Sequence, residues 1–402
     1  SKISNKANTG KLDSIFAIKD ATQSYKRSTD KFLEEKILST NRISVFGNSF
    51  ADKDIQALAQ ALGSHILGTG KIVERFEANF AKKIGLGCAV ATNSCTNAFW
   101  LLFKALKLDS NDEVIVPNIH FFGIKNVLDL LKIRTIIADV GTNIPNLTLE
   151  TIKNVITKNT KAIVFLEYGG YPTEIGQIRD YLKKIARTDI MLIVDAANSP
   201  FTQIKEKYTA LDFDFAVYSF DTNKILVTGD GGLILSENKK VVKKIKQLAY
   251  YGLKQGSESS FEKSQNQDKW WEFEIEEPSL KFAMNNLVAA LGIAQLSKIN
   301  GFLGKRERIR IKYLEKLKAL ATQKLITLPS NLNTVKNQVY LFWIRLKNTS
   351  SRDSLAKYLL RKGIYTTVKY QPISKTANTP NAFAFYSSCL CLPINQNLTE
   401  TD

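Results

Sequence analysis

Between residues 88 and 236, short runs of apolar and often β-branched residues alternate with amphipathic stretches of helical periodicity. The runs include EVIVP at 113–117, KAIVFLEY at 161–168 and MLIVDAA at 191–197. Strands that are separated by helices usually pair in parallel, with helices on both faces of the sheet. The alternation therefore predicts an α/β fold with a mainly parallel sheet, to which the segments 214–220 and 231–236 add two further strands.

The rest of the chain divides into an extension and a second, smaller unit. Residues 1–45 are polar and poorly periodic apart from a helix-like piece at 28–38, which predicts a weakly structured N-terminal extension. We expect a large domain at 46–280. Residues 281–402 begin with a long helical stretch. A strand–helix–strand pattern follows at 337–346, 351–363 and 364–372, and then the strand-like CLCLP at 389–393, so we expect a linking helix and a small C-terminal α/β domain there.

Composition excludes several classes of protein. No stretch approaches the roughly 18–20 uninterrupted apolar residues of a membrane span, and the first residues lack the pattern of a secretory signal. Four cysteines without metal-type spacing and only two histidines argue against a metal site. We therefore expect a cytoplasmic protein with reduced thiols, no bound metal and no membrane span.

The net charge of +18 raises the question of nucleic-acid binding. The basic residues are spread along the chain and are densest on helix-like stretches such as 239–248 and 305–318. Solvated helix faces usually explain such runs, so we expect no nucleic-acid partner. The charge is equally compatible with a small anionic substrate.

Polar side chains follow the carboxyl ends of several predicted strands, where ligands bind in α/β sheets of this kind. They are Ser94-Cys95-Thr96 after CAVATN, Asp195 at the end of MLIV, Ser219 at the end of DFAVY, and Lys224 shortly afterwards. An aldehyde cofactor needs a lysine to bind it covalently, a carboxylate for its ring nitrogen and donors for its phosphate. A helix that begins after Ser94 would offer free backbone N–H groups to that phosphate.

Each of these residues has a common structural explanation when it is taken alone. A lysine after a strand is usually a surface residue, and Asp195 or Ser94 could simply cap a helix. The order and spacing of the set indicate a site.

Five segments carry a resemblance to a known family. They are NSCTNA (93–98), VPNIHFFG (116–123), YGGYP (168–172), IVDAANS (193–199) and, above all, SFDTNKILVTGDGG (219–232). Together they resemble the DegT-type nucleotide-sugar aminotransferases, a branch of the fold-type I enzymes that use pyridoxal 5'-phosphate (PLP). The resemblance extends from about residue 52 to residue 393. It implies a seven-stranded, mainly parallel sheet in a large PLP-binding domain.

The resemblance implies roles for particular residues. Lys224 would bind the cofactor covalently and move protons, and Asp195 would pair with its ring nitrogen. Phe121 would stack on its ring, and Lys281 would reach the cofactor phosphate of a second subunit in a homodimer. The remaining cofactor contacts would come from Ser94, Cys95, Thr96, Ser219 and Asn198.

The chain departs from the family pattern at four positions. Asn198 replaces a glutamine that contacts the cofactor, so that contact could be lost or bridged by water. His120 replaces a threonine and is either an imidazole packed under the site or a substrate contact. Glu167 and Asp221 replace residues near the expected substrate, and Tyr168 follows Glu167. Our candidate substrate contacts are His120, Glu167, Tyr168 and Asp221.

The resemblance implies transfer of an amino group, with glutamate as donor, to a keto group of a nucleotide-linked sugar. Both substrates are anionic. Two alternatives stay open at this point. One is a PLP-dependent sugar dehydratase or deoxygenase, although such relatives tend to replace the cofactor lysine, which is present here as Lys224. The other is a non-catalytic PLP-binding regulator.

Overall fold

The computed structural model describes residues 43–64, 66–254 and 271–399. The predicted N-terminal extension, with its helix-like piece at 28–38, lies outside the described residues except for positions 43–45.

The central sheet has seven strands, and their order is β1-β9-β8-β5-β4-β2-β3. The strands are β1 Cys88–Thr92, β2 Glu113–Pro117, β3 Arg134–Ala138, β4 Thr160–Leu166, β5 Met191–Asp195, β8 Phe215–Ser219 and β9 Gly232–Ser236. Only β9 is antiparallel to its neighbours, β1 and β8. The predicted seven-stranded, mainly parallel sheet is confirmed.

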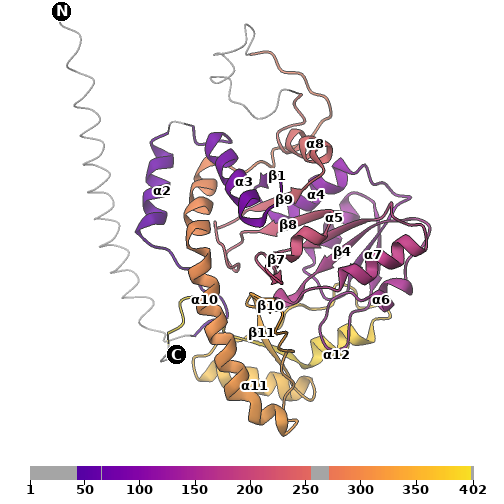
Figure 1. Cartoon of the computed structure of the whole chain (residues 1–402), viewed down its shortest axis with the longest axis vertical. Helices are drawn as coiled ribbons and strands as arrows, with labels where there is room; N and C mark the ends of the chain where they lie inside the picture. Colours follow the sequence, from indigo (N-terminus) through magenta and orange to yellow (C-terminus); the bar gives the residue numbers. More distant parts are fainter. Residues whose placement is uncertain (1–42, 65, 255–270, 400–402) are drawn as a thin grey trace, which may run out of the picture.

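Helices cover both faces of this sheet (Figure 1). They are α2 Asp52–Leu62, α3 Lys71–Ile84, α4 Cys95–Ala105, α5 Gly123–Leu130, α6 Leu149–Lys153, α7 Ile175–Lys184 and α8 Lys239–Ala249. Along β2, Val114 and Val116 join the apolar cluster that contains α4, α5 and α8, whereas Ile115 joins the cluster on the opposite face. Because both faces are covered, the inner strands are mostly apolar, whereas the edge strand β3 begins with the exposed Arg134.

The helix α10 (Asn286–Thr322) runs from α2 and α3 to the C-terminal part of the chain (Figure 1). By length and composition alone it could cross a membrane, but 44% of its apolar window is buried here. A buried core helix meets the same criteria, so this is weak evidence for a membrane span. The basic stretch 305–318 is not wholly solvated as predicted, because Arg306 is fully buried and donates to the Val339 and Ile394 carbonyl oxygens at 3.1 and 2.8 Å.

The C-terminal part contains β11 (Phe342–Arg345) and β12 (Cys389–Leu392), which pair antiparallel, together with α11 (Thr349–Arg361) and α12 (Pro380–Ser388). The segment 364–372 was predicted as a strand, but it makes only isolated bridges, such as Thr367 to Cys391. The helix α12 was not predicted. Short strands β6 (Gln203–Ile204), β7 (Lys207–Tyr208) and β10 (Val335–Lys336) form a separate small sheet.

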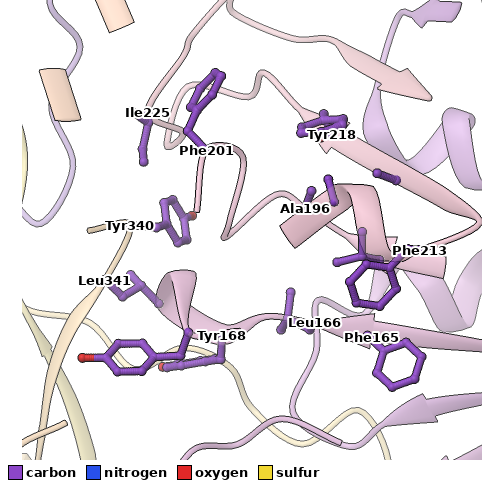
Figure 2. Packing of buried hydrophobic residues seen from close by; sticks show 14 of the residues in the cluster. Phe165, Leu166, Tyr168, Ala196, Phe201, Phe213, Tyr218, Ile225, Tyr340 and Leu341 are labelled. Carbon is purple, nitrogen blue, oxygen red and sulfur yellow. The ribbon is translucent and has the colours of Figure 1, made fainter. Parts of the chain in front are cut away.

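One apolar cluster joins the two parts of the chain. Figure 2 shows some of its members: Phe165, Phe213 and Tyr218 from the sheet side, and Tyr340 and Leu341 from the segment before β11. The junction between the parts is therefore a continuous buried layer. The domain boundaries at residues 46 and 281 stay predictions.

Candidate active site

The N-terminus of α4 lies at the carboxyl edge of the sheet, directly after β1. Ser94 caps the helix, because its hydroxyl accepts from the Asn97 N–H at 3.1 Å. The start of β9 comes very close to this turn: a Cβ atom at Gly232 would lie 2.6 Å from the backbone of Ser94 and Cys95. Only glycine fits at position 232, so the glycine-rich return after Lys224 holds the helix end against the sheet. Other backbone N–H groups of the first turn stay available to an anion.

Asp195 ends β5 and is buried, with 5% of its surface exposed. One carboxylate oxygen accepts from the Ala197 N–H at 3.0 Å. The other lies 3.4 Å from Nε2 of His120. The carboxylate is therefore fixed in position at the sheet edge, as the sequence predicts.

His120 has both ring nitrogens directed at protein groups. Its Nδ1 is 3.0 Å from the Phe121 carbonyl oxygen, and Nε2 faces Asp195 without making a hydrogen bond. Burial lowers the pKa of His120 more than the Asp195 carboxylate raises it. The geometry therefore favours the packed imidazole, one of the two alternatives that the sequence left open, over a substrate contact.

Lys224 lies in the connection between β8 and β9, where its N–H donates to the Asp221 carbonyl oxygen at 2.9 Å. Its Nζ is 3.3 Å from the hydroxyl oxygen of Tyr340. Burial alone would lower the pKa of Lys224, but the phenol oxygens of Tyr340 and Tyr370 and the Asp195 carboxylate outweigh it and raise the pKa. In the cofactor-free protein these groups therefore favour the ammonium form of the amine.

These elements enclose one cavity of about 310 Å³. Nine of the residues that the sequence singles out line it: Ser94, Cys95, Thr96, His120, Phe121, Asp195, Ser219, Asp221 and Lys224. A volume of this size is within the range of small-molecule sites. A larger, more open groove of about 1210 Å³ lies beyond β3, near α6 and α12, and contains none of these residues.

Two of the predicted substrate contacts, Glu167 and Tyr168, do not reach the cavity. The Glu167 carboxylate is buried and accepts from the Thr173 N–H at 3.1 Å and the Thr209 hydroxyl at 2.7 Å. Tyr168 is also buried, and its hydroxyl donates to the Lys369 carbonyl oxygen. Both assignments are corrected here: the turn that begins at these residues directs their side chains into the core and not toward the ligand space.

Asn198 lies beside the cavity but does not line it. Its amide oxygen accepts from the Gly169 N–H at 3.3 Å, and its Nδ2 donates to the Tyr370 hydroxyl at 3.2 Å. Both ends of this short side chain are thus engaged with protein, and a cofactor contact that is lost or bridged by water stays a prediction.

Lys281 lies outside the cavity of its own chain. Its side chain is exposed, and Nζ lies 5.4 Å from the centre of the Tyr250 ring. Contact with a second subunit stays a prediction.

Sequence reasoning missed three residues around Lys224. Lys369 and Tyr370 line the cavity, and Tyr340 accepts hydrogen bonds from both Lys224 and Lys369. All three come from the C-terminal part, more than a hundred positions away from Lys224 in the chain. No local pattern marks them, since 337–346 and 364–372 look like ordinary buried strands.

The site has an unusual thiol. Burial, followed by the nearby Asp195 carboxylate, raises the pKa of Cys95 well above its usual range. The thiol therefore stays protonated at neutral pH and is available as a weak donor. Within the described ranges, no group of three or more His, Cys, Asp and Glu residues is placed to hold a metal ion.

Comparison with known proteins places this site in context. The chain is 31% identical over 359 residues, 87% of its length and 91% of the relative's, to a dTDP-4-dehydro-2,3,6-trideoxy-D-glucose 4-aminotransferase of Saccharopolyspora spinosa. The crystal structure of the aminotransferase TlmJ from Streptoalloteichus hindustanus superposes with a TM-score of 0.81 at 29% identity, covering 90% of this chain and 95% of TlmJ. The structure of Spr1654 from Streptococcus pneumoniae, described as a putative sugar aminotransferase in its PMP form, shares the fold with the same TM-score of 0.81 at 21% identity, covering 89% of this chain and 95% of that one.

The family model of the DegT/DnrJ/EryC1/StrS aminotransferases matches residues 48–402. That match includes every strand of the sheet and every residue of the cavity described above. The chain belongs to the DegT/DnrJ/EryC1/StrS aminotransferase family.

Proposed function

We propose that the chain is a PLP-dependent aminotransferase that moves an amino group from glutamate to a keto group of a nucleotide-linked sugar. The observation that carries the proposal is the meeting of Lys224 and Asp195 in one cavity beside the N-terminus of α4. These are the three features that an aldehyde cofactor with a ring nitrogen and a phosphate needs. Family membership supports the reaction type.

The residues of the cavity fit this cofactor. The first turn of α4 presents backbone N–H groups and the Thr96 hydroxyl to the phosphate, and Ser219 and the protonated Cys95 lie on the same cavity wall. The ring of Phe121 packs against Phe122 with 4.3 Å between ring centres, but it is 46% exposed and lines the cavity, where it would stack on the cofactor. The buried Asp195 carboxylate favours a proton on the ring nitrogen.

When bound, PLP carries the amino group between the two substrates and stabilises negative charge at the carbon that is being deprotonated. Once its amine is released, Lys224 would move a proton from the substrate carbon to the cofactor carbon that the amine had occupied. Asp195 holds the proton on the ring nitrogen during this time. The Tyr340 hydroxyl accepts from the Lys224 amine at 3.3 Å and would hold it in the cavity whenever the amine is not bound to the cofactor.

The choice of substrates follows from charge and from the relatives. Glutamate and a nucleotide sugar are both anions, and the net charge of +18 attracts anions toward the site. The Saccharopolyspora spinosa relative is named for a dTDP-linked keto-sugar. We also propose a cytoplasmic location, because all four cysteines are free thiols, which is typical of a reducing compartment.

The test separates the two half-reactions. Enzyme loaded with PLP should change its absorbance spectrum when glutamate is added and should release one 2-oxoglutarate per site. Adding a keto-sugar nucleotide should then restore the spectrum and produce an amino sugar. An unchanged spectrum with glutamate and with every other amino acid tested would contradict the proposal.

We further propose a homodimer with shared active sites. Large apolar side chains are exposed next to Lys281: Tyr251 (44%), Ile275 (61%) and Leu280 (64%). Clustered exposed apolar residues of this size often mark a protein interface. In a two-fold dimer the same patch is used twice, so each Lys281 could reach the phosphate site of the other subunit.

Mixing two inactive variants tests this arrangement. Lys224→Ala and Lys281→Ala subunits, each inactive alone, should regain activity after exchange, because a hybrid dimer has one site with both lesions and one with neither. Random exchange should restore up to roughly a quarter of the wild-type activity. If exchange is verified by mass and no activity returns, Lys281 does not act across the interface.

A further inference from the structure

We infer that Lys369 is the binding site for the α-carboxylate of the amino donor. The inference rests on the proposed aminotransferase function and assigns to one side chain the recognition of one substrate group.

Lys369 is a half-buried cation in the wall of the cavity. Its ammonium group lies 4.3 Å from the centre of the Phe46 ring and 5.5 Å from that of Tyr370, and it donates to the Tyr340 hydroxyl at 3.4 Å. Aromatic faces attract a cation but leave its charge uncompensated. Throughout the described part of the chain, no Asp or Glu carboxylate lies within 4.0 Å of Lys369 Nζ.

The position of Lys369 is fixed by the surrounding structure. The Tyr168 hydroxyl donates to the Lys369 carbonyl oxygen, so the backbone is tied to the core next to β4. The Phe46 ring, from a segment far away in the chain, lies against the ammonium group itself. A charge that is placed in advance binds its ligand at a lower entropic cost than a flexible surface lysine does.

Tyr340 places the two lysines of the cavity next to each other. Its hydroxyl oxygen accepts from Lys224 Nζ at 3.3 Å and from Lys369 Nζ at 3.4 Å. Burial would raise the pKa of Tyr340, but the two ammonium groups outweigh it and lower the pKa. Two like charges that share one phenol oxygen form a site that an anion would stabilise further.

The closeness of Lys369 to Lys224 favours the carboxylate of an amino acid over the diphosphate of a nucleotide sugar. The donor nitrogen must come to the carbon that Lys224 otherwise holds, and each carboxylate oxygen of an α-amino acid lies only about 3 Å from that nitrogen. A cation that shares a hydrogen-bond acceptor with Lys224 is within reach of such a carboxylate. In a nucleotide sugar the diphosphate is separated from the reacting carbon by the sugar ring, which places it beyond Lys369.

The other charged groups that line the cavity are Asp195, Asp221 and Asp230. Asp195 is held by Ala197 beside His120, and Asp221 accepts from the Asn223 N–H at 2.9 Å. These carboxylates would repel the donor carboxylate. Lys369 therefore also orients the amino acid. The donor carboxylate is favoured only where Lys369 and Tyr340 line the cavity, away from these three aspartates.

The experiment uses Lys369→Met in the PLP-loaded protein and follows the donor half-reaction by absorbance. We expect kcat/KM for glutamate to fall about 10- to 100-fold, the cost of one charged hydrogen bond. The rate with 4-aminobutyrate, which lacks the α-carboxylate, should stay unchanged. The equilibrium binding of glutarate, which cannot react, should weaken by a similar factor. Lys369→Arg should recover part of the loss.

The matched control is Lys362→Met, since Lys362 also lies over a tyrosine ring, at 5.9 Å from Tyr358, but is exposed and outside the cavity. It should behave as the wild type in every assay. Lys369→Gln, which keeps a polar end, replaces Lys369→Met if the latter does not fold.

Three results would overturn the inference while the proposed function stands. One is an unchanged kcat/KM for glutamate in Lys369→Met. Another is an equal loss with 4-aminobutyrate, which would mean that Lys369 acts through Tyr340 and Lys224. A third is a loss with glutamate but none with alanine, which would assign Lys369 to the side-chain carboxylate. If the wild-type protein reacts with no amino acid, the proposed function itself fails.

Discussion

Replacing Lys224 by alanine should abolish turnover, lowering kcat/KM for glutamate by more than about 10³-fold, because one amine both binds the cofactor and moves the proton. The geometry gives the reason: of the residues that line the cavity, only Lys224 and Lys369 carry an amine. Lys224 lies in the connection after β8, in the same cavity as Asp195 and the N-terminus of α4. The loss is measured by following the glutamate half-reaction of Lys224→Ala and of the wild type by absorbance.

Labelling identifies the lysine independently of activity. Borohydride reduction of the loaded wild-type protein, followed by peptide mapping, should place the pyridoxyl group on Lys224. Lys369 is the other lysine that the cofactor could label, since it is in the same cavity and also donates to the Tyr340 oxygen. A label on Lys369, or on any other lysine, would refute the assignment. Lys336→Ala, at an exposed residue paired with Glu206, is the control for general effects of losing a lysine.

The raised pKa of Lys224 adds a pH dependence to cofactor loading. Attack on an aldehyde needs the free amine, and a raised pKa means that little free amine is present at neutral pH. The rate of loading should therefore increase as pH rises, by up to about tenfold per unit below the pKa. Removing the Tyr340 oxygen in Tyr340→Phe should lower the pKa of Lys224 and so speed loading at any given pH below it.

Much of the fold could be predicted from local sequence patterns. The apolar runs of β2, β4 and β5 are buried on both faces, so their composition alone distinguishes them from helices. The segment 364–372 misled for the same reason: it has the composition of a strand, but its partners are single residues in several different segments. The helix α12 was missed because its apolar residues have no clear helical period and only Pro380 marks its start.

The site was predictable where its residues follow strands and not where tertiary packing brings them in. Asp195 is the last residue of β5 and Ser219 is the last residue of β8. Ligands bind at the carboxyl ends of the strands in such sheets, and this rule located both residues. The same rule failed at Glu167, because the turn at Gly169, with φ of +65°, sends the chain back into the core. Tyr340 and Lys369 depend on how the C-terminal part packs on the sheet, which no short pattern encodes.

Replacing Asp195 by asparagine should lower the rate of the glutamate half-reaction about 10²- to 10³-fold, while the cofactor still attaches to Lys224. A neutral amide cannot keep a proton on the ring nitrogen, so charge at the reacting carbon loses its stabilisation. The half-reaction rate and the absorbance of the loaded variant measure the two parts of this prediction separately.

The fold should tolerate this change, which makes the test specific. The asparagine oxygen could still accept from the Ala197 N–H, now 3.0 Å from the carboxylate. Its amide nitrogen would donate to His120 Nε2, which has no hydrogen bond in the present structure and lies 3.4 Å from the carboxylate. The free energy of unfolding should therefore change by less than about 1 kcal/mol.

The matched control is Asp214→Asn. The Asp214 carboxylate also accepts a backbone N–H, that of Leu192 at 2.7 Å, but it lies outside the cavity. This variant should keep a rate near that of the wild type. If Asp195→Asn reacted with glutamate at a near-normal rate, the ring-nitrogen role would be wrong, because neither its contact with Ala197 nor that with His120 requires a negative charge.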